Sequence, residues 1–196
     1  MDSTAPIEQT DLPKQNISVT DTDPDLVITQ LAQQLAHCAA RRASFTIPAR
    51  LKQFMSFFQE CYEYFEETNK TQVATSQTSE WLMDNFYVIE QAVRQVEQDL
   101  PADYYQRLPK TRDGWARIHI FALANTRRDE ARLDIEQLRH FLHVFQEQTP
   151  LATGELWALP LMLRLTVLES LAEALSAVTR LKWDSTPLPK LIIDTS

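Results

Sequence analysis

The sequence predicts an all-α fold, an irregular bundle of about six helices with a disordered N-terminal tail. The chain has 196 residues, of which 44% are hydrophobic, enough for one sizeable core. It contains only two glycines, so the positive-φ positions that tight β-hairpins require are scarce. Apolar residues also recur at spacings of three and four along most of the chain. We expect an acidic tail over 1–23, a helical domain over 24–181 and a C-terminal tail over 182–196.

The tail and the first helix differ sharply in composition. Residues 1–23 carry five acidic side chains against one lysine, with few large apolar groups, which is typical of disorder. Asp23 and Pro24 together signal a helix start, and apolar residues at helical spacing follow them. We therefore expect the first helix near 24–42.

The second helix is strongly amphipathic. It opens near Thr46 and Pro48 and carries an apolar stripe at Leu51, Phe54, Met55, Phe58, Tyr62 and Phe65. The stretch 68–78 has no periodic apolar residues and is rich in Asn, Ser and Thr, so it predicts a flexible loop.

The middle of the chain predicts two clear helices and a weaker one. From Ser79 the apolar residues step by three and four as far as Leu100, where Pro101 ends the helix. The stretch 101–109, bounded by prolines, predicts an ordered connector with a short turn of helix. Residues 113–127 give a weaker helical pattern, whereas Asp134 begins a clean amphipathic helix that runs to Gln148 with capping-box spacing.

The last helix is expected from Thr153 or Gly154 to about Leu181. Pro160 lies inside it and removes one backbone donor, so we expect a kink there. We expect this helix and the one from Ser79 to form the central pair of the bundle. A short apolar run close to the end suggests a chain that is cut rather than finished.

Composition narrows the classes of function. The formal net charge of −8 disfavours binding to nucleic acid or anionic lipid. The polar start of the chain lacks the features of a secretory signal, and the longest uncharged apolar run is too short to span a membrane. Cys38 and Cys61 lie among apolar neighbours, which indicates buried thiols in a reducing compartment and no disulfide. We expect a cytoplasmic protein that reaches the inner-membrane face only through a partner.

Two sequence blocks resemble the N-terminal cytosolic region of cyclic β-1,2-glucan synthetases. The first runs from Glu80 through Trp81, Asp84 and Asn85 to Phe86, and continues at Leu100-Pro101. The second is Gly154-Glu155-Leu156-Trp157-Ala158-Leu159-Pro160-Leu161-Met162-Leu163-Arg164. Arg132-Leu133-Asp134 and the helix that follows also look alike, so the resemblance covers roughly Ser79 to Leu181, about half of the chain.

The resemblance implies a pathway, not a reaction on this chain. Members of that family are very large inner-membrane enzymes that polymerise glucose from UDP-glucose and close the product into a ring. Their transferase, membrane and phosphorylase-like parts lie C-terminal to the matched region, and this sequence has none of them. The residues also lack the alternation of strands and helices that a nucleotide-sugar fold requires. We expect no catalysis on this chain alone.

Several side chains could carry chemistry, but each has a simpler interpretation. Glu80 and Asp84 lie four residues apart, as paired carboxylates for glycoside hydrolysis could, yet they are more typical of a helix start and a solvated flank. His140 and His143 with Glu147 could begin a metal site, but no other His-rich helix supplies further ligands. His37 and His119 are isolated, and we expect surface or half-buried positions for them. The sequence predicts no metal, no cofactor and no catalytic residue.

The best candidates for binding residues are Trp81, Asp84, Asn85, Glu155, Trp157 and Arg164. The two tryptophans could stack on sugar faces, although aromatic residues at helical spacing more often belong to a core. The four polar residues are embedded in apolar helices, and buried polar groups must find partners. They could fasten one helix to another or to a neighbouring domain.

The sequence thus favours an accessory or scaffold segment of a cyclic glucan synthetase-like glycosyltransferase system. Its expected partner is a catalytic or membrane part of such an enzyme, reached through an apolar face that stays exposed when the partner is absent. Two alternatives stay open: a free-standing interaction domain, which would self-associate, and a small carbohydrate-active enzyme, which would require acids lining a pocket.

Overall fold

The structure, a computed structural model, describes residues 23–38, 43, 46–71, 76–101, 103–128 and 132–183. These residues form seven helices and no strand longer than a single bridge between Lys110 and Ala116. The helices are α1 (Pro24–Leu35), α2 (Ile47–Thr71), α3 (Gln77–Asp99), α4 (Tyr104–Arg107), α5 (Arg117–Arg128), α6 (Ile135–Gln148) and α7 (Thr153–Thr179). The all-α prediction is confirmed.

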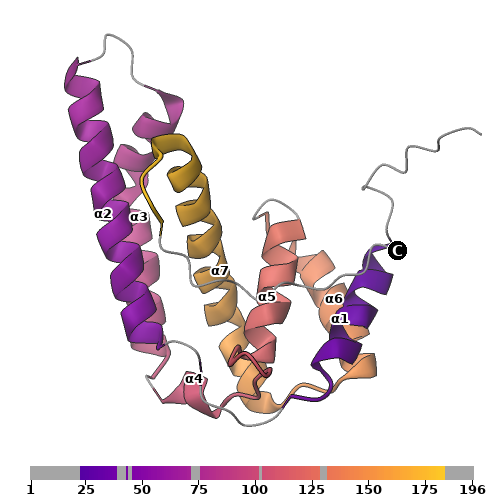
Figure 1. Cartoon of the computed structure of the whole chain (residues 1–196). Coiled ribbons are helices and arrows are strands. Elements are labelled where there is room, and N and C mark those ends of the chain that lie inside the picture. The colour runs from indigo at the N-terminus through magenta and orange to yellow at the C-terminus, as the bar shows by residue number, and fades with distance from the viewer. Residues whose placement is uncertain are drawn as a thin grey trace, which may run out of the picture.

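Helix α7 holds the two halves of the molecule together. It packs on α5 most extensively and also contacts α2 and α3, while α2 packs on α3 and α1 on α6. Figure 1 shows α7 between the long α2–α3 pair and α5, with α1 and α6 beyond α5. One hydrophobic core runs through all of these helices. We expected α3 and α7 to form the central pair. This prediction is wrong for α3, because α5 is the main partner of α7.

Two predicted helix boundaries differ from those in the structure. The first helix ends at Leu35, short of residue 42, and residues 39–42 lie outside the described part of the chain. The predicted loop 68–78 begins too early, because α2 continues to Thr71 and α3 begins at Gln77, after the N-cap Ser76. Asn69 donates a hydrogen bond to Ser79 Oγ at 2.7 Å, so polar side chains of this stretch join the two helices.

Burial on all sides explains the weak helical pattern of α5 in the sequence. Every residue from Arg117 to Thr126 is buried, so no solvated face interrupts the apolar one. Before it, the chain makes a tight turn in which Gly114 has φ 83°, a value that favours glycine. His119 lies in this helix and is fully buried, so the surface or half-buried position expected for it is wrong.

The ends of the described chain are anchored differently. The predicted disordered tail, except for Asp23, lies outside the described residues. At the other end, α7 stops at Thr179, and Arg180 adopts the left-handed conformation with φ 62°. The chain then turns back, and Trp183 stacks on Phe54 of α2 with a centroid distance of 5.2 Å and lies tilted against Phe57 at 4.9 Å. Residues 184–196 of the predicted C-terminal tail lie outside the described part.

Candidate functional site

The side of α7 that faces the protein contains two glutamates, Glu155 and Glu169, each about 99% or more buried. They lie fourteen residues apart, nearly four helical turns, so both point into the same side of the bundle. A buried carboxylate is costly unless it is paired and hydrogen-bonded, so its partners decide whether the helix is stable there.

Glu155 forms a bidentate ion pair with Arg117, the first residue of α5. Both Arg117 nitrogens, Nε and Nη2, lie 2.6 Å from the carboxylate oxygens, and Nη2 also donates to the Pro150 carbonyl at 2.8 Å. Glu155 Oε2 accepts a further bond from the Ala152 N–H at 2.9 Å, which caps α7. The hydrogen bonds to Glu155 raise the pKa of Arg117 above its ordinary value. This pair fastens the start of α7 to the start of α5.

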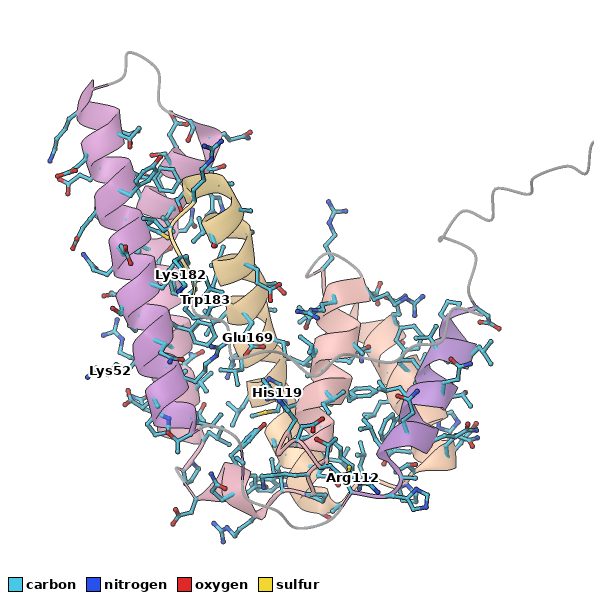
Figure 2. The ribbon with its side chains drawn as sticks, viewed as in Figure 1. Lys52, Arg112, His119, Glu169, Lys182 and Trp183 are labelled. Carbon is cyan, nitrogen blue, oxygen red and sulfur yellow. The ribbon has the colours of Figure 1, made fainter. Side chains whose placement is uncertain are left out.

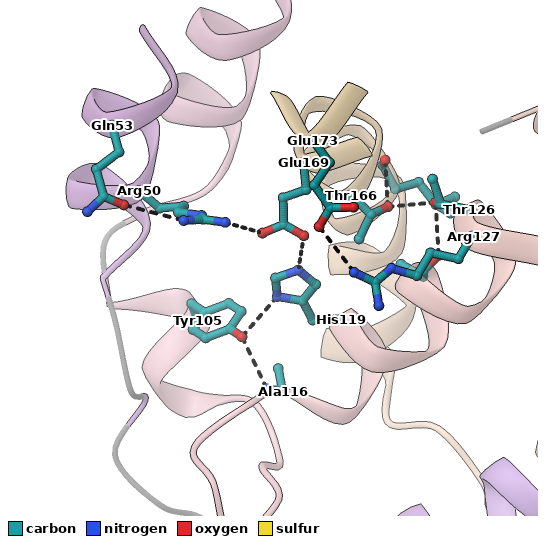
Figure 3. A network of polar contacts seen from close by, with 12 residues as sticks. Arg50, Gln53, Tyr105, Ala116, His119, Thr126, Arg127, Thr166, Glu169 and Glu173 are labelled. Atoms are coloured by element: carbon teal, nitrogen blue, oxygen red, sulfur yellow. Dashed lines mark hydrogen bonds and ion pairs between the residues drawn. The ribbon is translucent and has the colours of Figure 1, made fainter. Parts of the chain in front are cut away.

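Glu169 joins three other elements in a second buried network (Figure 3). Arg50 of α2 donates from Nη2 to its Oε1 at 3.4 Å, and His119 Nε2 of α5 lies 3.6 Å from its Oε2. On the other edge of the ring, His119 Nδ1 lies 3.1 Å from the hydroxyl of Tyr105 in α4. That hydroxyl accepts a bond from the Ala116 N–H at 3.1 Å.

The Tyr105 hydroxyl links two parts of the network. It accepts a hydrogen bond from the Ala116 N–H and shares another with His119 Nδ1. Burial raises the pKa of Tyr105, so the phenol keeps its proton in the folded chain.

Arg50 is held on both sides. It lies against the rings of Phe54 and Trp183, 4.9 and 4.8 Å from their centroids, while Gln53 accepts a bond from its Nη1 at 3.5 Å. Figure 2 shows Trp183 on the side of α7 that faces α2, with His119 between α7 and α5. His119, Glu169 and Tyr105 are all less than 2% exposed. A substrate cannot reach these groups, so the network serves to fix α7 against α2, α4 and α5.

The opposite side of α7 is half-exposed or exposed and mostly apolar, with Ser170 and Glu173 also at such positions. Val167 is two residues from Glu169, about 200° around the helix, and the residues at its spacing share its side. We call this row the α7 stripe: Leu156, Trp157, Pro160, Arg164, Val167, Leu171, Ala174 and Val178. Trp157 is 76% exposed and Val178 55%, and Arg164 is the stripe's one charged residue. A helix that is apolar on every side is usually covered on every side.

Two adjoining hollows lie along this stripe and share Val167. The first has a volume of about 490 Å³ and runs between Trp81 of α3 and Arg127 of α5. The second, about 300 Å³, runs between Ala92 of α3 and Leu133 and is almost wholly apolar. We call the two together the α7 groove. It is a concave and mostly apolar surface.

Some of the predicted binding residues line the α7 groove, and others lie elsewhere. Trp81, which is 48% exposed, and Arg164 line it. Trp157 belongs to the stripe, at the other end of α7 from Trp81. Asp84 is exposed, and Asn85 donates a hydrogen bond to the Trp81 carbonyl of its own helix. Glu155 lies apart from the groove and fastens two helices, as one interpretation of the sequence expected.

The histidines considered for metal binding turn to separate partners. His140 Nε2 lies 2.9 Å from Asp25 of α1, and His143 pairs with Glu147 at 3.3 Å. Across the described ranges, three or more potential metal-ligating side chains never gather. Within the same residues, no helix combines the length and apolarity needed to cross a bilayer.

Sequence reasoning missed Arg50, Arg117 and Glu169. The available signal was a charged residue inside an apolar helical run, as Glu169 stands between Leu168 and Leu171. The stripe also had a signal, since the region from Leu156 to Val178 has apolar residues on every side of the helix.

Comparison with known proteins gives one informative relative. The chain is 34% identical over 105 residues to the cyclic β-(1,2)-glucan synthase NdvB of Rhizobium meliloti (strain 1021). The match covers 52% of this chain but only 4% of the length of that relative. No protein-family model matches the chain, and no solved structure matches it. The chain is thus similar to a small part of a very long glucan synthase.

Proposed function

We propose that this chain is a non-catalytic helical accessory segment of a cyclic β-1,2-glucan synthase-like system, and that it docks onto another part of that system through the α7 stripe. The observation that carries the proposal is the stripe itself, an apolar row along the full length of the helix that holds the bundle together. Exposed apolar surface of this extent marks interaction sites in soluble proteins.

The similarity to the glucan synthase supports the choice of partner. The matched stretch is only 4% of the relative's length. In that protein, the rest of the same chain is available to cover such a surface. The buried networks support a scaffold role as well, because they fix the stripe in place and have no access for a substrate.

The acids around the hollows of this surface give no support to a glycoside-cleaving site. Neither hollow of the α7 groove is lined by a carboxylate. Glu155 lines a third, smaller hollow of about 200 Å³, but both of its oxygens are bonded to Arg117. Glycoside hydrolysis requires two carboxyl groups that flank the bond to be broken.

The test is a pair of substitutions at exposed stripe positions, Ala174→Glu and Val178→Glu, made together in the chromosomal gene. Charges there disrupt docking without entering the core, so we expect cellular cyclic β-1,2-glucan to fall severalfold while the amount of folded chain is unchanged. Leu26→Glu, at a half-exposed apolar position of α1, is the matched control and should leave the glucan level unchanged. An unchanged glucan level in the stripe variant would refute the proposal.

A free-standing interaction domain is the alternative function. Sedimentation of the full chain distinguishes this alternative. If the chain self-associates through the stripe, the same two substitutions should abolish self-association and leave the glucan level unaffected.

A further inference from the structure

We infer that the α7 groove binds an amphipathic helix whose apolar row is flanked by two acidic residues, one on each side and about nine residues apart. The inference rests on the proposed function and specifies the chemistry of the surface that docks on α7.

The walls of the groove suit a helix. Trp81 and Ala92, which line the two hollows from α3, are eleven residues apart, close to three helical turns. On α7 the groove runs from Pro160 to Ala174, roughly 21 Å along the helix axis. A long trough with apolar residues at helical spacing fits a row of apolar side chains from a second helix laid along it.

The charges that line the groove are all positive. Although the chain carries a net charge of −8, the only ionisable residues lining the two hollows are Arg127 and Arg164. Arg127 lies 3.1 Å from Glu173, and Arg164 lies 3.9 Å from Asp99. All four side chains are between 41% and 61% exposed, and ion pairs at such positions contribute little and exchange readily. Both arginines are therefore available to acids of a partner.

The positions of the arginines set the spacing of those acids. Arg164 pairs with the last residue of α3, whereas Arg127 approaches from α5, so the two belong to opposite walls. Along α7, Arg127 lies level with its partner Glu173, nine residues beyond Arg164, or roughly 14 Å. Nine residues are two and a half helical turns, so acids nine apart on a helix aligned with α7 also lie on opposite sides.

Other occupants fit less well. A symmetric contact with the same groove of a second copy would set arginines against arginines, with no acid among the lining residues. An anionic bilayer would be repelled by the net charge of the chain and is flat where this surface is concave.

The test uses synthetic 22-residue helical peptides with one apolar row, titrated into the full chain and followed by tryptophan fluorescence. One peptide carries Glu at positions 6 and 15, a second carries Lys there, and a third carries the two Glu seven residues apart on one flank. At low salt we expect the first to bind about tenfold more tightly than either other peptide. The charge-reversed variant R127E/R164E should prefer the Lys peptide, whereas R139E, at an exposed pair on α6, should behave like the wild type.

Each remaining outcome overturns the inference. Equal affinity for the three peptides would show that the acidic residues of the partner are not recognised. If no peptide binds, the occupant is not a helix of this kind. Binding of anionic lipid vesicles that depends on the stripe would identify a membrane surface instead. Self-association in sedimentation that W81A abolishes and Y87A preserves would identify a second copy. None of these results depends on glucan production, so this inference can fail while the proposed function stands.

Discussion

The two sides of helix α7 are both mostly apolar, and they differ in how their charged residues are placed. The side turned into the protein packs apolar residues around Glu155 and Glu169, which are fully buried against arginines. The side turned to solvent carries the α7 stripe, which includes Arg164 and has the exposed Glu173 beside it. Most surface helices place apolar residues inside and charges outside.

This difference separates two tasks. Buried ion pairs add little to net stability, but removing one partner is costly, so they select one position and one register for the helix. The most exposed residues of the stripe, Trp157 and Val178, add little to the isolated fold, whereas Leu171 packs against the core. The buried charges therefore hold α7 in place, and the exposed stripe is the surface that we propose for docking.

Breaking the Arg117–Glu155 pair should have the largest effect on stability. Glu155→Ala leaves a buried guanidinium without its bidentate partner, and we expect the free energy of unfolding to fall by about 3 to 5 kcal/mol in urea denaturation. Arg117→Met combined with Glu155→Leu should recover part of that loss, though not the cap that Glu155 provides to Ala152. Glu136→Ala, in the exposed first turn of α6, is the control. A loss below about 1 kcal/mol for Glu155→Ala would contradict this account.

The second network should be somewhat less sensitive. Glu169→Ala removes the acceptor of Arg50, but the guanidinium keeps its contacts with Phe54 and Trp183. We expect a loss of about 2 to 4 kcal/mol. Glu173→Ala, four residues along the same helix and exposed, should cost less than about 1 kcal/mol. Equal effects of the two variants would show that burial of Glu169 is not what matters.

Stability should also depend on pH through Cys61. Burial raises the pKa of its thiol to about 11, although a hydrogen bond with Thr179 lowers it somewhat. The folded state therefore holds this proton more tightly than the unfolded state does. That contribution, about 2 to 3 kcal/mol, is complete below the unfolded pKa near 9 and is lost as the pH rises to about 11.

Denaturation curves between pH 8 and pH 11 measure this contribution. Cys61→Ala should unfold with a shallower pH dependence than the wild type over this range, since Tyr105 contributes equally to both. The thiol of the partly exposed Cys38 should react with a disulfide reagent before that of Cys61. Parallel pH dependences of the two proteins would contradict the assignment.

Substitutions on the stripe should have the smallest effect on the isolated chain. Trp157→Ala and Val178→Glu change exposed side chains, and we expect the free energy of unfolding to move by less than about 0.5 kcal/mol. Thermal denaturation followed by circular dichroism checks this. A loss above about 2 kcal/mol would mean that the stripe is part of the fold rather than a free surface.

The sequence was sufficient for the helices but not for the two sides of α7. Periodic apolar residues and caps such as Asp134 are local signals, so they located the helices. Burial of His119 and the partners of Glu169 depend on how distant helices pack, and one-dimensional spacing does not contain that information. Likewise, Trp81 and Trp157 follow the apolar pattern of core residues, and only the packing of α5 and α3 shows that they are exposed.

Site-specific photo-crosslinking from the stripe tests the central claim most directly. A photoreactive amino acid placed at Leu171 in the chromosomal gene should crosslink in living cells to a glucan synthase-type sequence, whereas the same group at Leu26 of α1 should not. Crosslinks of equal yield and identity from both positions, or none from Leu171 while the chain is folded and the glucan is made, would contradict a docking role for this side of α7.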